Sequence, residues 1–182
     1  MKNLFNYSRV ATAIVFVLSA LLAIELIMKN DLWYFRATPL NLSSYVVLPC
    51  IGQITVLCFF MLIYIGSAKG SVLRKPTLIG IISVSLGICN MIFHTEFLGN
   101  ILIGLIVSLG LFWSLLNVIK YTNSRLVEVL CMIFSILNIP TFIGVNTLYM
   151  LFGYNIIWPI FEIISFLFLS AFYYAFAKNI NN

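Results

Sequence analysis

The stretch IIWPIFEIISFLFLSAFYYAFA, from Ile156 to Ala177, decides the fold class of this chain. It is long enough to cross a bilayer, because about 20 apolar residues span the hydrocarbon core. The stretch has Pro159 near its start and one ionisable residue, Glu162, among apolar neighbours. A carboxyl group is costly in hydrocarbon, so we expect neighbouring helices to supply polar partners for it. The stretch therefore predicts a transmembrane helix that belongs to a polytopic bundle.

The composition of the whole chain also indicates a membrane protein. Of its 182 residues, 63% are hydrophobic and 8% are charged, whereas a soluble domain carries about 25% charged residues. A soluble fold of this size has too little interior to hide so much apolar surface. We therefore predict an all-α integral membrane protein, multi-pass, that forms a single transmembrane domain over residues 1–182 and has the lipid bilayer as its first partner.

Hydrophobic runs of spanning length follow one another along the chain and predict a bundle of six transmembrane helices. The expected spans are residues 10–28, 45–67, 77–95, 99–119, 127–149 and 155–177. The first run is longer than the hydrophobic part of a usual signal peptide, and no small-x-small cleavage site precedes Lys29-Asn30-Asp31. We therefore expect this run to be retained as the first span.

The basic residues give the predicted bundle an orientation. If the spans alternate in direction, only Lys29 and Arg36 lie on one side of the membrane, and the other basic residues lie on the opposite side: Lys2, Arg9, Lys69, Arg74, Lys75, Lys120, Arg125 and Lys178. Lysine and arginine are enriched on the cytoplasmic side, so both termini are predicted to be cytoplasmic. The bases form no continuous patch and no aromatic platform lies outside the runs, so no nucleic-acid partner is expected.

Small residues spaced four apart recur within the predicted spans. This spacing lets helix backbones approach closely, and helix packing is the expected role. The pairs are Ser19/Ala23, Ser83/Gly87, Gly104/Ser108 and Gly110/Ser114. The four cysteines form no CxxC pair, and all of them fall inside predicted spans, where we expect small apolar core residues.

Polar residues in the outer half of the bundle predict a binding site. Glu162 and Gln53 lie about two turns inside the outer ends of the sixth and second spans. The segment Asn138-Ile139-Pro140 is expected to kink or open the fifth span, and Pro49 and Pro159 are expected to free further backbone carbonyls. The predicted ligand-binding residues are Glu162, Gln53, Asn90, His94, Asn138 and Asn146.

An acidic, outward-facing pocket suits a cation, a proton or an amine-bearing small molecule. Our leading hypothesis is therefore a protein that binds or transports such a ligand. In length and number of spans the chain is similar to the substrate-binding subunits of energy-coupling-factor transporters. This resemblance is one of size and topology and rests on no sequence motif. Under the alternative reading of Glu162, the carboxyl group is protonated, or is satisfied by Asn or Gln across a helix interface, and serves packing alone.

Two other function classes remain open. The chain is alternatively a membrane interaction, accessory or immunity-type protein without a ligand, with a protein partner or a second copy of itself. An intramembrane enzyme is the third reading, although the sequence has no HExxH, GxSxG or Walker motif. We predict no catalytic residue, no cofactor and no metal site, since His94 is the only histidine. The composition, rich in Asn, Ile, Lys and Phe, is typical of AT-rich bacterial genomes and favours the bacterial cytoplasmic (inner) membrane.

Overall fold

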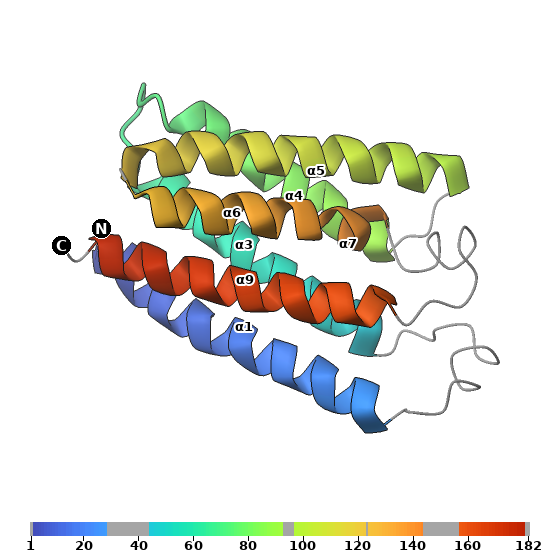
Figure 1. Ribbon diagram of the computed structural model, residues 1–182. Coiled ribbons are helices and arrows are strands. Elements are labelled where there is room, and N and C mark those ends of the chain that lie inside the picture. The colour runs from blue at the N-terminus through green and yellow to red at the C-terminus, as the bar shows by residue number, and fades with distance from the viewer. Residues whose placement is uncertain (1, 29–43, 93–96, 123, 144–156, 181–182) are drawn as a thin grey trace.

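The computed structural model describes residues 2–28, 44–92, 97–122, 124–143 and 157–180 (Figure 1). Within these ranges the chain is helical, apart from short turns, and contains no strand. The helices are α1 (Lys2–Met28), α3 (Ser44–Gly66), α4 (Arg74–Ile92), α5 (Phe97–Ile119), the 3-10 turn η1 (Lys120–Thr122), α6 (Arg125–Leu137), α7 (Ile139–Ile143) and α9 (Ile157–Ile180).

Six stretches of the described residues are long and apolar enough to cross a membrane, which confirms the predicted number and order of spans. The largest difference lies at the first helix, which begins at Lys2 rather than near Val10. Hydropathy marks the residues that enter hydrocarbon, whereas a helix continues through polar residues that satisfy their own backbone bonds. The six stretches are Asn3–Ile24, Val47–Gly66, Arg74–Ile92, Gly99–Ile119, Arg125–Phe142 and Ile160–Asn179.

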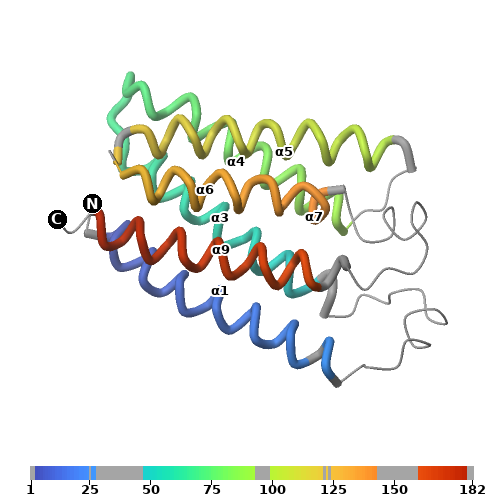
Figure 2. Tube along the Cα trace, in the orientation of Figure 1, coloured from blue at the N-terminus to red at the C-terminus, as the bar shows by residue number. Residues whose placement is uncertain are grey.

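The long helices run side by side as one bundle, with α1 packed along α9 (Figure 2). Helix α1 begins and α9 ends at the same end of the bundle, where the α3–α4 and α5–α6 connections also lie (Figure 1). The eight basic residues that were predicted to share one side are carried on these connections and the adjoining helix ends. We call this the basic end; α7 lies toward the opposite end.

The core of the bundle combines aliphatic side chains from all the long helices with a group of aromatic rings on α3 and α9. Phe59 is fully buried and meets Phe172, Tyr173 and Phe176 with ring centroids 5.7, 5.7 and 5.0 Å away. Tilted and edge-on ring pairs of this kind add to the packing energy that comes from buried area. Large aliphatic side chains cover the outward faces instead; Ile65, for example, is 79% exposed. Such faces suit contact with lipid chains.

Glycines allow close approach between helices, as the four-residue spacing predicted. A Cβ atom on Gly110 of α5 would lie 2.2 Å from Ser83 Oγ of α4, and one on Gly87 would lie 2.2 Å from the Phe142 ring. These contacts confirm the packing role of Ser83, Gly87 and Gly110. Glycine is required at Gly87 and Gly110, because a neighbouring ring or hydroxyl already fills the space that a Cβ atom would occupy.

The four cysteines have free thiols and differ in exposure. Cys131 is buried, Cys50 and Cys58 are half-buried, and Cys89 is exposed on α4. The expectation that all four are core residues is therefore wrong for Cys89. A thiol is a small, weakly polar group, so an outward face in contact with lipid accommodates it as well as a core does.

Candidate functional site

A break in the fifth span positions the candidate site. Helix α6 ends at Leu137, Asn138 caps it, and the short α7 follows. Pro140 has no N–H group and so cannot donate to the carbonyl of Ile136, four residues earlier. The backbone bonds that remain around the break run from Asn138 N–H to Phe134 O (2.9 Å) and from Phe142 N–H to Asn138 O (3.4 Å). The fifth span is thus interrupted at the predicted place, Asn138-Ile139-Pro140, while the backbone of Asn138 stays in the right-handed helical region (φ −83°, ψ −8°).

Polar side chains from three other helices meet this break. Gln53 Nε2 of α3 donates to Asn138 Oδ1 at 2.7 Å. Thr141 Oγ1 of α7 donates to Glu162 Oε2 of α9 at 2.5 Å. Asn90 Nδ2 of α4 donates to the carbonyl oxygen of Phe142 at 2.8 Å. We call the polar side chains of these contacts the α7 cluster: Gln53, Asn90, Asn138, Thr141 and Glu162.

Each residue of the α7 cluster is at most 5% exposed, so the cluster lies in the interior of the bundle. The structure thus brings together four of the predicted site residues, Gln53, Asn90, Asn138 and Glu162. The other two, His94 and Asn146, lie outside the described residues.

Thr141 is the member of the α7 cluster that sequence analysis missed. It follows Pro140 directly and lies three residues after Asn138, so it shares a helix face with a residue that was singled out. Threonine hydroxyls in apolar helices usually bond to their own backbone, as Thr12 and Thr77 do here. Nothing in the sequence indicates that the hydroxyl of Thr141 donates to another helix. This bond is known only because the structure places Glu162 beside it.

The three prolines act differently. Pro49 lies inside α3, which continues through it. Pro159 is in the first turn of α9. The first N–H groups of an α-helix have no acceptor within that helix, so the missing N–H of Pro159 interrupts no bond of α9. Of the three prolines expected to free backbone carbonyls, Pro140 interrupts its helix, Pro49 removes one donor within a helix that continues, and Pro159 has no residue of α9 four positions before it.

Several buried polar atoms at the break have no hydrogen-bond partner among the residues that the structure describes. They are Gln53 Oε1, Asn90 Oδ1, Asn138 Nδ2 and Glu162 Oε1 of the α7 cluster, and two hydroxyls one turn away, Ser135 Oγ and Ser165 Oγ. A buried polar group without a partner costs about 1–3 kcal/mol. Native structures therefore hold few of them, and bound water or an ion is a common explanation.

The orientation of the side-chain amides follows from their partners. Asn90 Nδ2 faces two carbonyl oxygens, those of Phe142 and, at 3.4 Å, Asn100, so the nitrogen must point to them and leave the oxygen unpartnered. The Gln53–Asn138 pair leaves one oxygen and one nitrogen unpartnered whichever way the two amides are turned. Both places therefore present an available amide oxygen, Asn90 Oδ1 and Gln53 Oε1.

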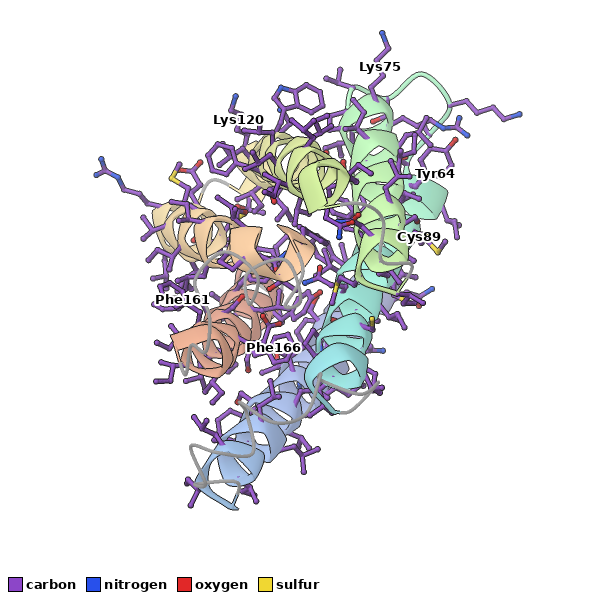
Figure 3. The ribbon with its side chains drawn as sticks, turned by 90° about the vertical axis from the view of Figure 1, so that its right-hand side faces the viewer. Tyr64, Lys75, Cys89, Lys120, Phe161 and Phe166 are labelled. Carbon is purple, nitrogen blue, oxygen red and sulfur yellow. The ribbon has the colours of Figure 1, made fainter. Side chains whose placement is uncertain are left out.

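Contacts along α3 and α9 set the level of each polar side chain. A Cβ atom on Gly52 of α3 would lie 2.3 Å from the Phe166 ring of α9, so these two residues lie at the same level. Figure 3 shows Phe166 between α9 and α3, whereas Phe161 points away from the bundle. By this register Gln53 and Ser165 lie at the same level of the bundle.

The electrostatics of the site are dominated by Glu162. Within the described part of the chain, no basic side chain pairs with its carboxyl group, whose hydrogen bond comes from the neutral hydroxyl of Thr141. The described lysines and arginines lie at the basic end (Figure 1). An ionised carboxylate at this place would need a compensating positive charge, because burial disfavours an isolated ion.

A second buried polar group, the tyrosine cluster, joins α1, α3 and α9 through Tyr7, Thr55 and Tyr173. Tyr7 Oη donates to the carbonyl oxygen of Thr55 at 2.5 Å, and Thr55 Oγ1 lies 3.3 Å from Tyr173 Oη. Thr55 Oγ1 also donates to the carbonyl oxygen of Gly52 at 2.7 Å. Every side-chain oxygen of this cluster therefore has a partner. Sequence analysis missed this cluster, since tyrosine and threonine are common in apolar helices.

Comparison with protein-family models, with curated proteins and with solved structures found no match to this chain.

Proposed function

We propose that this protein is a multi-pass membrane protein of the transport type, which binds a small molecule or a cation at the α7 cluster. The observation that carries the proposal is the buried carboxyl group of Glu162 at a helix break, with Oε1 unpartnered among the described residues. Ionisable groups within membrane-spanning segments are costly and mark substrate or ion sites by default.

The interrupted fifth span supports this proposal. The backbone of Asn138 keeps helical dihedral angles (φ −83°, ψ −8°), but Pro140 leaves the carbonyl of Ile136 without its usual donor. Backbone groups freed in this way are tolerated at membrane depth where protein buries them or where they line a water-filled cavity. Many transporters place their substrate and ion sites at such discontinuous helices, near the middle of the membrane. The break between α6 and α7 has side chains from α3, α4 and α9 bonded to it, so a ligand bound there would contact four spans at once.

The proposed orientation places both termini in the cytoplasm and the α7 cluster in the outer half of the membrane. Its support is the collection of basic residues at one end of the bundle, together with the preference of such residues for the cytoplasmic side. The Asn-, Ile-, Lys- and Phe-rich composition supports the bacterial cytoplasmic membrane. Lys69→Cys and Lys178→Cys in a cysteine-free variant should react with an impermeant maleimide only after the membrane is opened. Labelling of either residue in intact cells would contradict the orientation.

Thermal unfolding in detergent tests the binding proposal. A ligand that binds the folded protein raises its Tm by mass action. We expect one class of compound or ion, from a panel of salts, amines and neutral metabolites, to stabilise the wild type and to have no effect on Glu162→Gln. Glu128→Gln is the matched control, because Glu128 is a half-buried carboxyl group in the first turn of α6, at the basic end. A response that survives in Glu162→Gln would contradict the site.

The alternative is an interaction protein without a ligand. The bonds Gln53–Asn138 and Thr141–Glu162 favour it, because hydrogen bonds between helices stabilise a membrane bundle whether or not a ligand binds. On this alternative no compound in the panel changes the Tm. A defined protein then co-purifies with the wild type in stoichiometric amount.

A further inference from the structure

We infer that the ligand of the α7 cluster is a dehydrated monovalent cation of the Na⁺ class, held by side-chain oxygens of Glu162, Gln53 and Ser165. This inference rests on the proposed function and names the ligand of the same site. Four observations lead to it: the charge of the site, the chemistry of its unpartnered atoms, the helix end beside it, and the packing around it.

The charge of the site favours a cation with a single positive charge. Glu162 is the one acidic residue whose side chain meets the break among the described residues, and the described basic residues lie at the other end of the bundle. One carboxylate and one monovalent cation make the buried site neutral. A divalent ion would leave an excess positive charge, since sites for Ca²⁺ gain affinity from several carboxylate ligands.

The unpartnered atoms near the break are mostly hard oxygen donors. They comprise a carboxylate oxygen, two amide oxygens and two hydroxyl oxygens, against one amide nitrogen. Carboxylate, carbonyl and hydroxyl oxygens suit hard cations, whereas soft and borderline metals prefer thiolate and imidazole. Amide and hydroxyl oxygens replace the water molecules that a cation loses when it leaves bulk solvent, as carbonyl oxygens do in potassium channels.

Three of these oxygens lie within adjoining levels of the bundle. Ser165 is three residues after Glu162, on the same face of α9. Gln53 of α3 lies near the level of Ser165, because the residues next to them in sequence, Gly52 and Phe166, approach each other closely. Gln53 also reaches Asn138 at the end of α6. The side chains of α3, α6 and α9 therefore surround the place where a cation would balance Glu162.

The end of α6 adds a favourable field. The last carbonyls of a helix carry partial negative charge. Helix α6 ends at Leu137, beside Asn138 and Pro140. Broken helices of transporters use such C-terminal ends and unwound carbonyls to coordinate Na⁺ or H⁺. At the break, the carbonyl of Ile136 lacks the donor that Pro140 cannot supply, whereas the carbonyls of Phe134 and Asn138 accept backbone N–H groups.

Aromatic rings restrict the size of the ligand. The Phe166 ring fills the space that a side chain at Gly52 would occupy, next to Gln53. The Phe142 ring does the same at Gly87, next to Thr141. Both rings are fully buried, and both helices approach them at a glycine. Close-packed walls of this kind favour a bare ion over an amine with an organic skeleton.

Cation titration of the purified protein tests the inference. The Tm is measured in NaCl, LiCl, KCl and choline chloride at constant ionic strength and constant pH, and binding of radioactive ²²Na⁺ is measured directly. At a cation concentration about 100 times Kd, mass action predicts a Tm increase of roughly 5–10 °C for a chain of this size. We expect this increase with one or more alkali cations in the wild type and in Glu128→Gln, and its loss in Glu162→Gln.

A milder variant keeps the test decisive if Glu162→Gln fails to fold. Ser165→Ala removes one hydroxyl and leaves the charge intact, so it should fold and should weaken cation binding at least several-fold. Ser170→Ala, which alters another buried serine of α9, should leave binding unchanged; its hydroxyl donates to the carbonyl of Thr12 instead.

The possible outcomes separate this inference from the proposed function. Stabilisation by an organic compound but by no alkali cation overturns the cation and keeps the binding site, provided that Glu162→Gln abolishes it. A Tm that depends on pH but not on any cation identifies a proton as the ligand, and this also overturns the inference. If no ion, compound or pH change acts differently on the wild type and on Glu162→Gln, both the inference and the proposed function are wrong.

Discussion

The α7 cluster and the tyrosine cluster are both buried polar groups in an apolar bundle, yet their hydrogen bonding differs. In the tyrosine cluster, the hydroxyls of Tyr7, Thr55 and Tyr173 all have partners. In the α7 cluster, Glu162 and Gln53 each retain an oxygen without a partner among the described residues. A satisfied polar network stabilises and orients helices, whereas unpartnered groups cost stability and persist where a ligand completes them. We therefore propose a structural role for the tyrosine cluster and a binding role for the α7 cluster.

The largest expected effect tests the structural role of the tyrosine cluster. Tyr173 is fully buried and its ring packs against Phe59 and Phe172. Tyr173→Ala should lower the free energy of unfolding by about 3–5 kcal/mol, because it leaves a large cavity. Equilibrium unfolding in mixed detergent micelles measures the loss. A loss below about 1 kcal/mol would show that this region is not the packed core.

The next effect concerns the glycine that lies between the two clusters. A Cβ atom on Gly52 would lie 2.3 Å from the Phe166 ring, and the carbonyl of Gly52 accepts from Thr55. Gly52→Ala should therefore cost about 1–3 kcal/mol through overpacking, and should also weaken the ligand response at Gln53. Gly66→Ala is the control, since nothing lies within 4 Å of its added Cβ atom. Equal effects of the two substitutions on Tm would contradict the close contact.

A smaller effect isolates hydrogen bonding in the tyrosine cluster. Tyr173→Phe keeps the ring and removes the hydroxyl that lies 3.3 Å from Thr55 Oγ1. We expect a loss of about 0.5–1.5 kcal/mol in the free energy of unfolding. The cation or compound response should stay at the wild-type value. If Tyr173→Phe abolished that response, the two clusters would act as one site and the distinction between them would fail.

The smallest effect on stability is expected at Glu162, together with the largest effect on binding. In Glu162→Gln the side chain keeps an oxygen that can accept from Thr141, and it carries no charge that must be buried. Without ligand, the free energy of unfolding should change by less than about 1 kcal/mol. Thermal unfolding with and without added cation then compares the two roles directly. A large loss of stability with an unchanged cation response would assign Glu162 to packing.

Single residues of the site were predictable to the extent that their chemistry was unusual for a membrane span. Glu162, Gln53, Asn90 and Asn138 stand out because carboxyl and amide groups are costly in hydrocarbon. Pro140 marks the break because proline cannot donate a backbone hydrogen bond. The pairing of Glu162 with the amides was open from sequence, and the structure assigns its bond to the hydroxyl of Thr141 instead. Hydroxyl groups were not singled out, because serine and threonine readily donate a hydrogen bond to a carbonyl of their own helix.

The sequence by itself determined the class of the protein, the number and order of its spans, the collection of basic residues at one end, and the helix break at Pro140. Each of these follows from local properties: the length of apolar runs, the spacing of charges and the missing N–H group of proline. The tertiary structure decided which helices meet at the break. It also decided that Thr141 bonds to Glu162 and that Phe166 closes against Gly52. Those contacts depend on how each helix is rotated about its axis and how far it is shifted along it. Most residues of a span have similar hydropathy, so the sequence does not determine rotation or shift; packing between the helices does.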